Sequence, residues 1–156
     1  MAPKPNDSTK PGTSDAWRDI AAIERVVAGF LDRTLPCKEW THAAHLTVGL
    51  WHAREFPPAE ALDRVRSGIK LYNGACGVAN TTTGGYHETL TRFYMGLIGH
   101  YLAGVADRSD CLAVTNALLA RHGHRDVPLG YYSRERLMSP AARAAWIEPD
   151  LRPLEW

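Results

Sequence analysis

The sequence lacks the cysteine pattern of a disulfide-stabilised or zinc-ribbon protein. It has only three cysteines in 156 residues, Cys37, Cys76 and Cys111, and no C-x-x-C motif. An odd number of widely spaced cysteines is not typical of a small disulfide framework. We therefore expect each cysteine to be a small buried hydrophobic residue. Because the opening segment 1–15 also has no apolar h-region, the sequence predicts a cytoplasmic protein without a secretory signal.

An excess of charge, long apolar runs and nucleotide-binding glycine motifs are also missing. Lys and Arg number 18 and Asp and Glu number 17, so the formal net charge is +1. This balance does not provide the clustered basic surface that nucleic acid binding requires. No apolar run approaches the roughly 18 residues of a membrane span. We therefore expect the protein to act on a small-molecule substrate and to bind neither nucleic acid nor a membrane. The sequence leaves open whether the chain forms a homo-oligomer.

Helical periodicity accounts for most of the chain. Residues 1–14 are rich in Pro, Lys, Ser and Thr, and we expect a disordered arm there. Beyond the arm, apolar residues recur at three- and four-residue intervals, and capping residues and prolines divide the pattern into helices. The expected helices cover residues 15–35, 42–56, 59–73, 86–105, 110–121 and 140–147.

The spacing of these helices predicts the fold class and the domain organisation. The prolines and tryptophans near the C-terminus indicate a tail that is strapped across the other helices. No repeat or linker divides residues 15–156, which we expect to form a single helical domain. The sequence therefore predicts an all-α protein, an irregular bundle of about five helices with a C-terminal strap.

Two histidines lie on one face near the start of the second expected helix. His42 and His45 are three residues apart in T-H-A-A-H-L, so both project from the side that carries Leu46. A buried imidazole needs partners for both ring nitrogens, which a metal ion and a neighbouring acceptor can supply. The pair is spaced to chelate one ion, although a histidine on an apolar face can also be a hydrogen-bonded core residue.

Two further side chains of the metal-binding type lie on apolar faces of other helices. His87 is centred on the apolar stripe of the fourth helix, and Glu24 lies beside Ile20 on the first. This composition suits Fe, Zn, Mn or Ni better than Ca or Mg. The predicted ligands of a divalent transition metal are His42, His45, His87 and Glu24.

The surroundings of His87 supply candidate catalytic and substrate-binding residues. Glu88 could transfer protons, but with Gly85 as the N-cap it could equally stabilise the helix N-terminus. Tyr94 could reach the same cavity or be a core aromatic. The glycine-rich loop before His87 could bind a substrate, or it could be an ordinary connector between helices. The C-terminal segment could likewise bind the substrate, or it could be a tail packed on the surface. The candidate substrate-binding residues are Asn80, Thr83 and Arg134, with Arg136 as an alternative to Arg134.

Three segments resemble those of a family of small bacterial proteins. They are W-T-H-A-A-H-L over residues 40–46, N-T-T-T-G-G-Y-H-E-T-L-T over residues 80–91 and Y-Y-S-R-E-R-L-M-S-P-A-A-R over residues 131–143. The similarity spans nearly the whole chain after the N-terminal arm. The resemblance implies one domain and implies no particular activity.

Two main classes of function fit these observations. The first is a small metal-dependent enzyme acting on a small polar molecule, by hydrolysis or isomerisation with Zn(II) or by dioxygen chemistry with Fe(II). The second is a ligand- or partner-binding helical module without catalysis, in which aromatic residues line a pocket or an interface. A third hypothesis is a metal-free acid–base enzyme that pairs His87 with Glu24.

Overall fold

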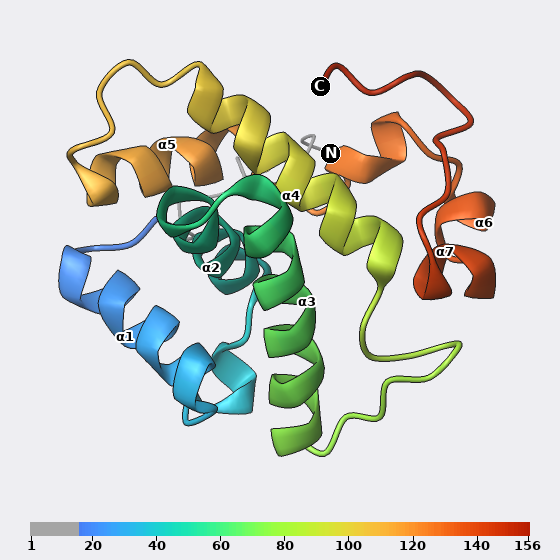
Figure 1. Cartoon of the computed structure of the whole chain (residues 1–156), viewed down its shortest axis with the longest axis horizontal. Coiled ribbons are helices and arrows are strands. Elements are labelled where there is room, and N and C mark those ends of the chain that lie inside the picture. Colours follow the sequence, from blue (N-terminus) through green and yellow to red (C-terminus); the bar gives the residue numbers. More distant parts are fainter. Residues whose placement is uncertain (1–15) are drawn as a thin grey trace, which may run out of the picture.

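The computed structural model describes residues 16–156, so the arm expected over residues 1–14 lies outside them. The described residues form helices and no strand, which confirms the predicted all-α fold class. None of the described helices is both long and apolar enough to span a membrane. The long helices (Figure 1) are α1 (Ile20–Asp32), α2 (His42–Glu55), α3 (Pro58–Ala75), α4 (Glu88–Ala103) and α5 (Cys111–His122). The short ones are η1 (Cys37–Glu39), η2 (Val127–Gly130), α6 (Arg134–Leu137) and α7 (Pro140–Ala144).

The long helices begin where the sequence offers a cap. The side chains of Asp19, Thr41 and Asp110 each accept a hydrogen bond from a backbone N–H in the first turn of α1, α2 and α5. Such a cap satisfies a donor that the helix itself leaves unpaired. α3 begins at Pro58, whose fixed φ suits the first turn. Because Asp19 is its cap, α1 begins later than the predicted residue 15.

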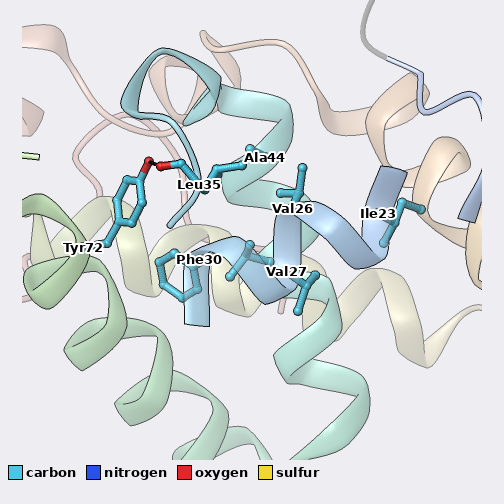
Figure 2. Close-up of a cluster of buried hydrophobic side chains, with 8 residues drawn as sticks. Ile23, Val26, Val27, Phe30, Leu35, Ala44 and Tyr72 are labelled. Carbon is cyan, nitrogen blue, oxygen red and sulfur yellow. Dashed lines mark hydrogen bonds between the residues drawn. The ribbon is translucent and has the colours of Figure 1, made fainter. Parts of the chain in front are cut away.

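The α1 helix buries one apolar stripe against α2 and α3. Ile23, Val26 and Phe30 are spaced by three and four residues, and all are buried. Figure 2 shows these side chains gathered in one cluster with Leu35 and Tyr72. The Tyr72 hydroxyl donates a hydrogen bond of 2.9 Å to the Leu35 carbonyl, so α3 also holds the turn that follows α1.

The α2 helix lies at the centre of the bundle and packs against α1, α3, α4 and α5. One side contributes Ala44 and Val48 to the cluster with α1. Another side contributes Leu46 and Leu50 to a second cluster with α4 and α5. Because other helices surround α2, many of its side chains point into the interior of the bundle, where a binding site could lie.

A disulfide joins the segment before α2 to the end of α3, contrary to the prediction from the cysteine count. Cys37 and Cys76 are bonded, with their Cα atoms 5.9 Å apart, although 39 positions separate them in the sequence. Cys37 is exposed, so the prediction that it is a buried hydrophobic residue is wrong; Cys111 is a free, half-buried thiol. Disulfides persist in oxidising compartments, so the cysteines no longer favour a cytoplasmic protein.

The residues after α7 run back along α4, which confirms the predicted C-terminal strap (Figure 1). Trp146 and Trp156 pack on a buried cluster that includes Phe93 and Tyr132. Trp156 lies so close to α4 that a Cβ atom at Gly96 would be 2.3 Å from its indole nitrogen. The strap thus depends on a glycine at this point of α4.

Candidate functional site

A cavity of about 630 Å³ lies between α2, α3, α4 and residues 125–138; we call it the α2–α4 cavity. Its volume falls within the range of about 300–1,000 Å³ that is usual for small-molecule sites. The wall is mainly apolar and aromatic. Five residues singled out from the sequence share this wall, namely His42, His45, His87, Tyr94 and Arg134.

His45 is held as a neutral imidazole on the wall of the α2–α4 cavity. Its Nδ1 lies 2.8 Å from the Thr41 carbonyl, so Nδ1 carries the proton and Nε2 is an acceptor. Burial lowers the pKa of His45 to about 4, and the positive charge of Arg125 contributes in the same direction. The Trp40 indole packs on the imidazole with ring centroids 3.8 Å apart. Within residues 16–156, Nε2 forms no hydrogen bond, which leaves this acceptor to a ligand.

His42 and Tyr94 meet where α2 packs against α4. Their ring centroids are 5.2 Å apart and the rings lie at 66° to each other. Burial raises the pKa of Tyr94 above its usual range, and the negative charge of Asp126 adds to this effect. The phenol is therefore protonated at neutral pH, where it can donate a hydrogen bond but cannot act as a base.

His87 links two parts of the structure through both of its ring nitrogens. It is the N-cap of α4, where its Nδ1 accepts a hydrogen bond of 3.2 Å from the Leu90 N–H. Its Nε2 donates a hydrogen bond of 2.8 Å to the Leu137 carbonyl. A metal ligand needs one of these nitrogens, so His87 cannot coordinate a metal in this arrangement. The prediction that Gly85 is the N-cap is wrong, because His87 takes that position.

Glu88 forms an ion pair between helices and is not among the residues that line the α2–α4 cavity. Its carboxylate oxygens accept hydrogen bonds from Arg66 Nη2 at 2.7 Å and Arg66 Nε at 2.9 Å. The Tyr86 hydroxyl donates a third, at 2.6 Å. The hydrogen bonds from Arg66 hold the pKa of Glu88 below its usual range. The carboxylate thus ties α3 to α4, and this geometry gives no support to its predicted proton-transfer role.

Glu24 lies on the exposed face of α1, so the prediction that it faces the core is wrong. The prediction centred the buried stripe on Ile20 and Leu31, but these side chains are 41% and 48% exposed. The buried stripe is instead centred on Val26, on the other side of the helix from that assumed. Glu24 therefore cannot join His42 and His45 on the cavity wall.

The predicted metal set is not assembled in this structure. Within residues 16–156, no group of three or more His, Cys, Asp and Glu side chains is arranged to hold a metal ion. Of the predicted ligands, His42, His45 and His87 line the cavity, but both ring nitrogens of His87 already have hydrogen-bond partners. Glu24 lies on the exposed face of α1. The metal therefore stays a prediction that rests on the pair in α2.

The loop before α4 is held together by Asn80. The Asn80 Oδ1 accepts hydrogen bonds of 2.9 Å from the Tyr86 N–H and from the Asn73 side-chain amide. Gly85 has a φ of +73°, and a Cβ there would lie 2.5 Å from the Ala79 carbonyl oxygen. The loop thus needs glycine for its own closure, and Asn80 stabilises the loop instead of facing the cavity.

Of the predicted substrate-binding residues, Arg134 is the one that lines the α2–α4 cavity. Thr83 is exposed in the loop before α4 and is absent from the wall. Arg125 and Trp40 also line the cavity, although no pattern in the sequence marks them as site residues. Both lie in irregular segments, for which helical periodicity gives no orientation.

A second hollow of about 680 Å³ lies between α4, α5 and the C-terminal segment. His100, His122 and His124, which show no pattern in the sequence, are on its wall. Its wall includes the exposed charged side chains of Arg121, Asp126, Arg152 and Glu155. The α2–α4 cavity, with its apolar wall and neutral imidazole, is the better candidate for a site.

A scan against protein-family models and searches of curated proteins and of solved structures found no match to this chain. The resemblance to a family of small bacterial proteins therefore stays a prediction. The chemistry of the α2–α4 cavity is therefore the basis for proposing a function.

Proposed function

We propose that this protein binds a small, largely apolar organic molecule in the α2–α4 cavity. The observation that supports this proposal is a cavity of about 630 Å³ whose wall combines apolar and aromatic side chains with a few hydrogen-bonding groups. Small-molecule sites commonly have this composition, because the apolar wall provides affinity and the polar groups provide orientation. The proposal corresponds to the non-catalytic binding module of the sequence analysis.

Two polar side chains would orient the bound molecule. The Nε2 atom of His45 can accept a hydrogen bond from a hydroxyl or amide N–H, and the Tyr94 hydroxyl can donate one. An imidazole with a pKa of about 4 is a weak base at neutral pH, where an efficient general base has a pKa near 7. The chemistry of His45 thus favours binding over proton transfer.

Protein-observed NMR with a library of small aromatic and aliphatic compounds tests this proposal. We expect bound compounds to perturb the resonances of His45 and Tyr94. The His45→Phe variant keeps a ring but loses the acceptor, so compounds with a hydroxyl or amide N–H should bind about tenfold more weakly. His100→Phe is the matched control, since His100 is exposed and lies outside this cavity. Binding that is confined to other surfaces, or equal in both variants, would contradict the proposal.

A metal-dependent enzyme is the second candidate function, because His42 and His45 share one cavity wall at chelating spacing. In this case the pair would hold Fe, Zn, Mn or Ni, and the ion would supply Lewis-acid or redox chemistry. Elemental analysis of the same wild-type and His45→Phe proteins separates the two candidates. Stoichiometric metal that is lost in the variant favours the enzyme, whereas compound binding that chelators leave unchanged favours the binding module.

A further inference from the structure

Two arginines on the wall of the α2–α4 cavity have no acidic partner in the part of the chain that the structure describes. Arg125 follows α5, and Arg134 is the first residue of α6. Within residues 16–156, neither guanidinium takes part in an ion pair. The nearby Arg136 and Arg143 are engaged with the backbone instead, donating to the carbonyls of Glu148 and Gly85 at 2.7 and 2.9 Å. Arg125 and Arg134 are therefore the arginines that remain available to a ligand.

The ionised groups on the wall leave a net positive charge. One carboxylate, that of Asp126, also lines the cavity, and it lies 3.8 Å from the His124 imidazole. His45 does not add a charge at neutral pH because it is uncharged there. The positive charge of Arg125 contributes to lowering the pKa of both His45 and Tyr94, so its field extends to the aromatic wall.

We infer that the molecule bound in the α2–α4 cavity is an organic monocarboxylate, with an apolar or aromatic body against the wall and its carboxylate toward Arg125 and Arg134. A guanidinium matches the geometry of a carboxylate and can bind it through two parallel hydrogen bonds. One negative charge on the ligand balances the net charge of the wall. The inference rests on the proposed function and narrows its ligand class.

Calorimetric titration of the wild-type chain with matched acid and amide pairs tests the inference. Suitable pairs are 1-naphthaleneacetate with 1-naphthaleneacetamide, and octanoate with octanamide, since each pair differs in the charge and keeps the apolar body. We expect the acids to bind about tenfold more tightly than the amides. The preference should disappear in the Arg125→Gln/Arg134→Gln double variant.

The matched control is the Arg18→Gln/Arg108→Gln double variant, which removes the same charge from exposed positions outside the cavity and should retain the preference. Amides that bind the wild-type chain as tightly as the acids would overturn the inference and leave the proposed function standing. A preference that persists in the Arg125→Gln/Arg134→Gln variant would overturn it as well. If neither acids nor amides bind and the NMR screen finds no compound in the cavity, the proposed function fails together with the inference.

Discussion

At the scale of single residues, the ion pair between Glu88 and Arg66 is placed where its loss should be measurable. The Glu88 side chain is 11% exposed and that of Arg66 is 26% exposed, so solvent screens the pair less than an ion pair on the surface. Three hydrogen bonds reach the carboxylate, two from Arg66 and one from Tyr86. Removing its charge leaves the partly buried guanidinium of Arg66 with only the exposed carboxylate of Asp63 as a counter-charge, which costs free energy.

We therefore expect Glu88→Gln to lower the free energy of unfolding at pH 7 by about 1–3 kcal/mol. The pKa of Glu88 is lowered in the folded chain, mainly by its hydrogen bonds from Arg66. Its stabilisation is thus complete above the unfolded pKa of about 4.3 and is lost as the pH falls through the lower folded value. Urea unfolding from pH 7 to pH 3 should show the gap between wild type and variant closing.

Glu60→Gln is the control for this prediction, because Glu60 forms an exposed pair with Arg64 within α3. Such a pair contributes little to stability. A gap for Glu88→Gln that does not change with pH would show that the loss is due to packing and not to charge.

Residues of the candidate site could be predicted from the sequence where they lie on long helices, because helical periodicity indicates which way a side chain points. His42, His45 and Tyr94 lie on long helices, and all three line one cavity. The role of His87 could not be predicted, because its second partner, the Leu137 carbonyl, is 50 positions away in the sequence. For Arg125, in an irregular segment, no periodic pattern indicates where the side chain points.

At the scale of secondary-structure elements, the bounds of a helix could be predicted where a capping residue or a proline marks them. The ranges of α2 and α3 follow from Thr41 and the prolines at 57 and 58. α7 ends at Ala144, before the predicted residue 147. The Ala145 carbonyl there accepts a hydrogen bond of 2.8 Å from the Thr89 hydroxyl, and its backbone is already extended. A contact with α4 thus ends this helix, and a local sequence pattern cannot reveal it.

We predict that the disulfide between η1 and the end of α3 stabilises the fold. Cys37 and Cys76 close a loop with a sequence separation of 39 around α2 and α3, which restricts the unfolded chain. For a loop of this length, we expect reduction or the Cys37→Ser/Cys76→Ser variant to lower the free energy of unfolding by about 3–4 kcal/mol. Urea unfolding with and without a dithiol reductant measures the difference. Cys111→Ser, which removes the free thiol, is the control and should change much less.

Equal unfolding curves for the oxidised and reduced wild-type chains would contradict this prediction. The disulfide also lies beside the site, since Trp40 follows η1 and Asn73 precedes Cys76, and both line the α2–α4 cavity. Reduction should therefore weaken the binding of a cavity ligand as well as the fold.

At the scale of the whole molecule, the C-terminal segment holds the outer wall of the cavity in place. The Leu151 N–H donates to the Tyr131 carbonyl at 2.9 Å. Asp150 accepts hydrogen bonds from the Ser133 backbone and hydroxyl at 2.7 and 2.6 Å. These bonds attach the tail to the segment that precedes Arg134, which lines the cavity.

We expect Trp156→Ala to lower the free energy of unfolding by about 2 kcal/mol, since it removes a half-buried indole from its contact with α4. The wall carrying Arg134 should loosen at the same time, so the variant should bind cavity ligands more weakly than wild type. Thermal unfolding and the NMR screen measure both effects. Trp156→Phe keeps a ring against Gly96 and should lose less of each; an Ala variant with wild-type stability would contradict the role of the strap.

The disulfide also has a mechanical consequence. Because Cys37 and Cys76 are covalently joined, α2 and α3 lie inside a closed ring that a pulling force applied to the two termini cannot open. The oxidised chain can extend through the residues outside the ring, while the enclosed 39 positions contribute no length. At about 3.3–3.6 Å per extended residue, the stretched oxidised chain should be shorter than the reduced one by roughly 130 Å. Single-molecule pulling would thus detect the bond as missing contour length.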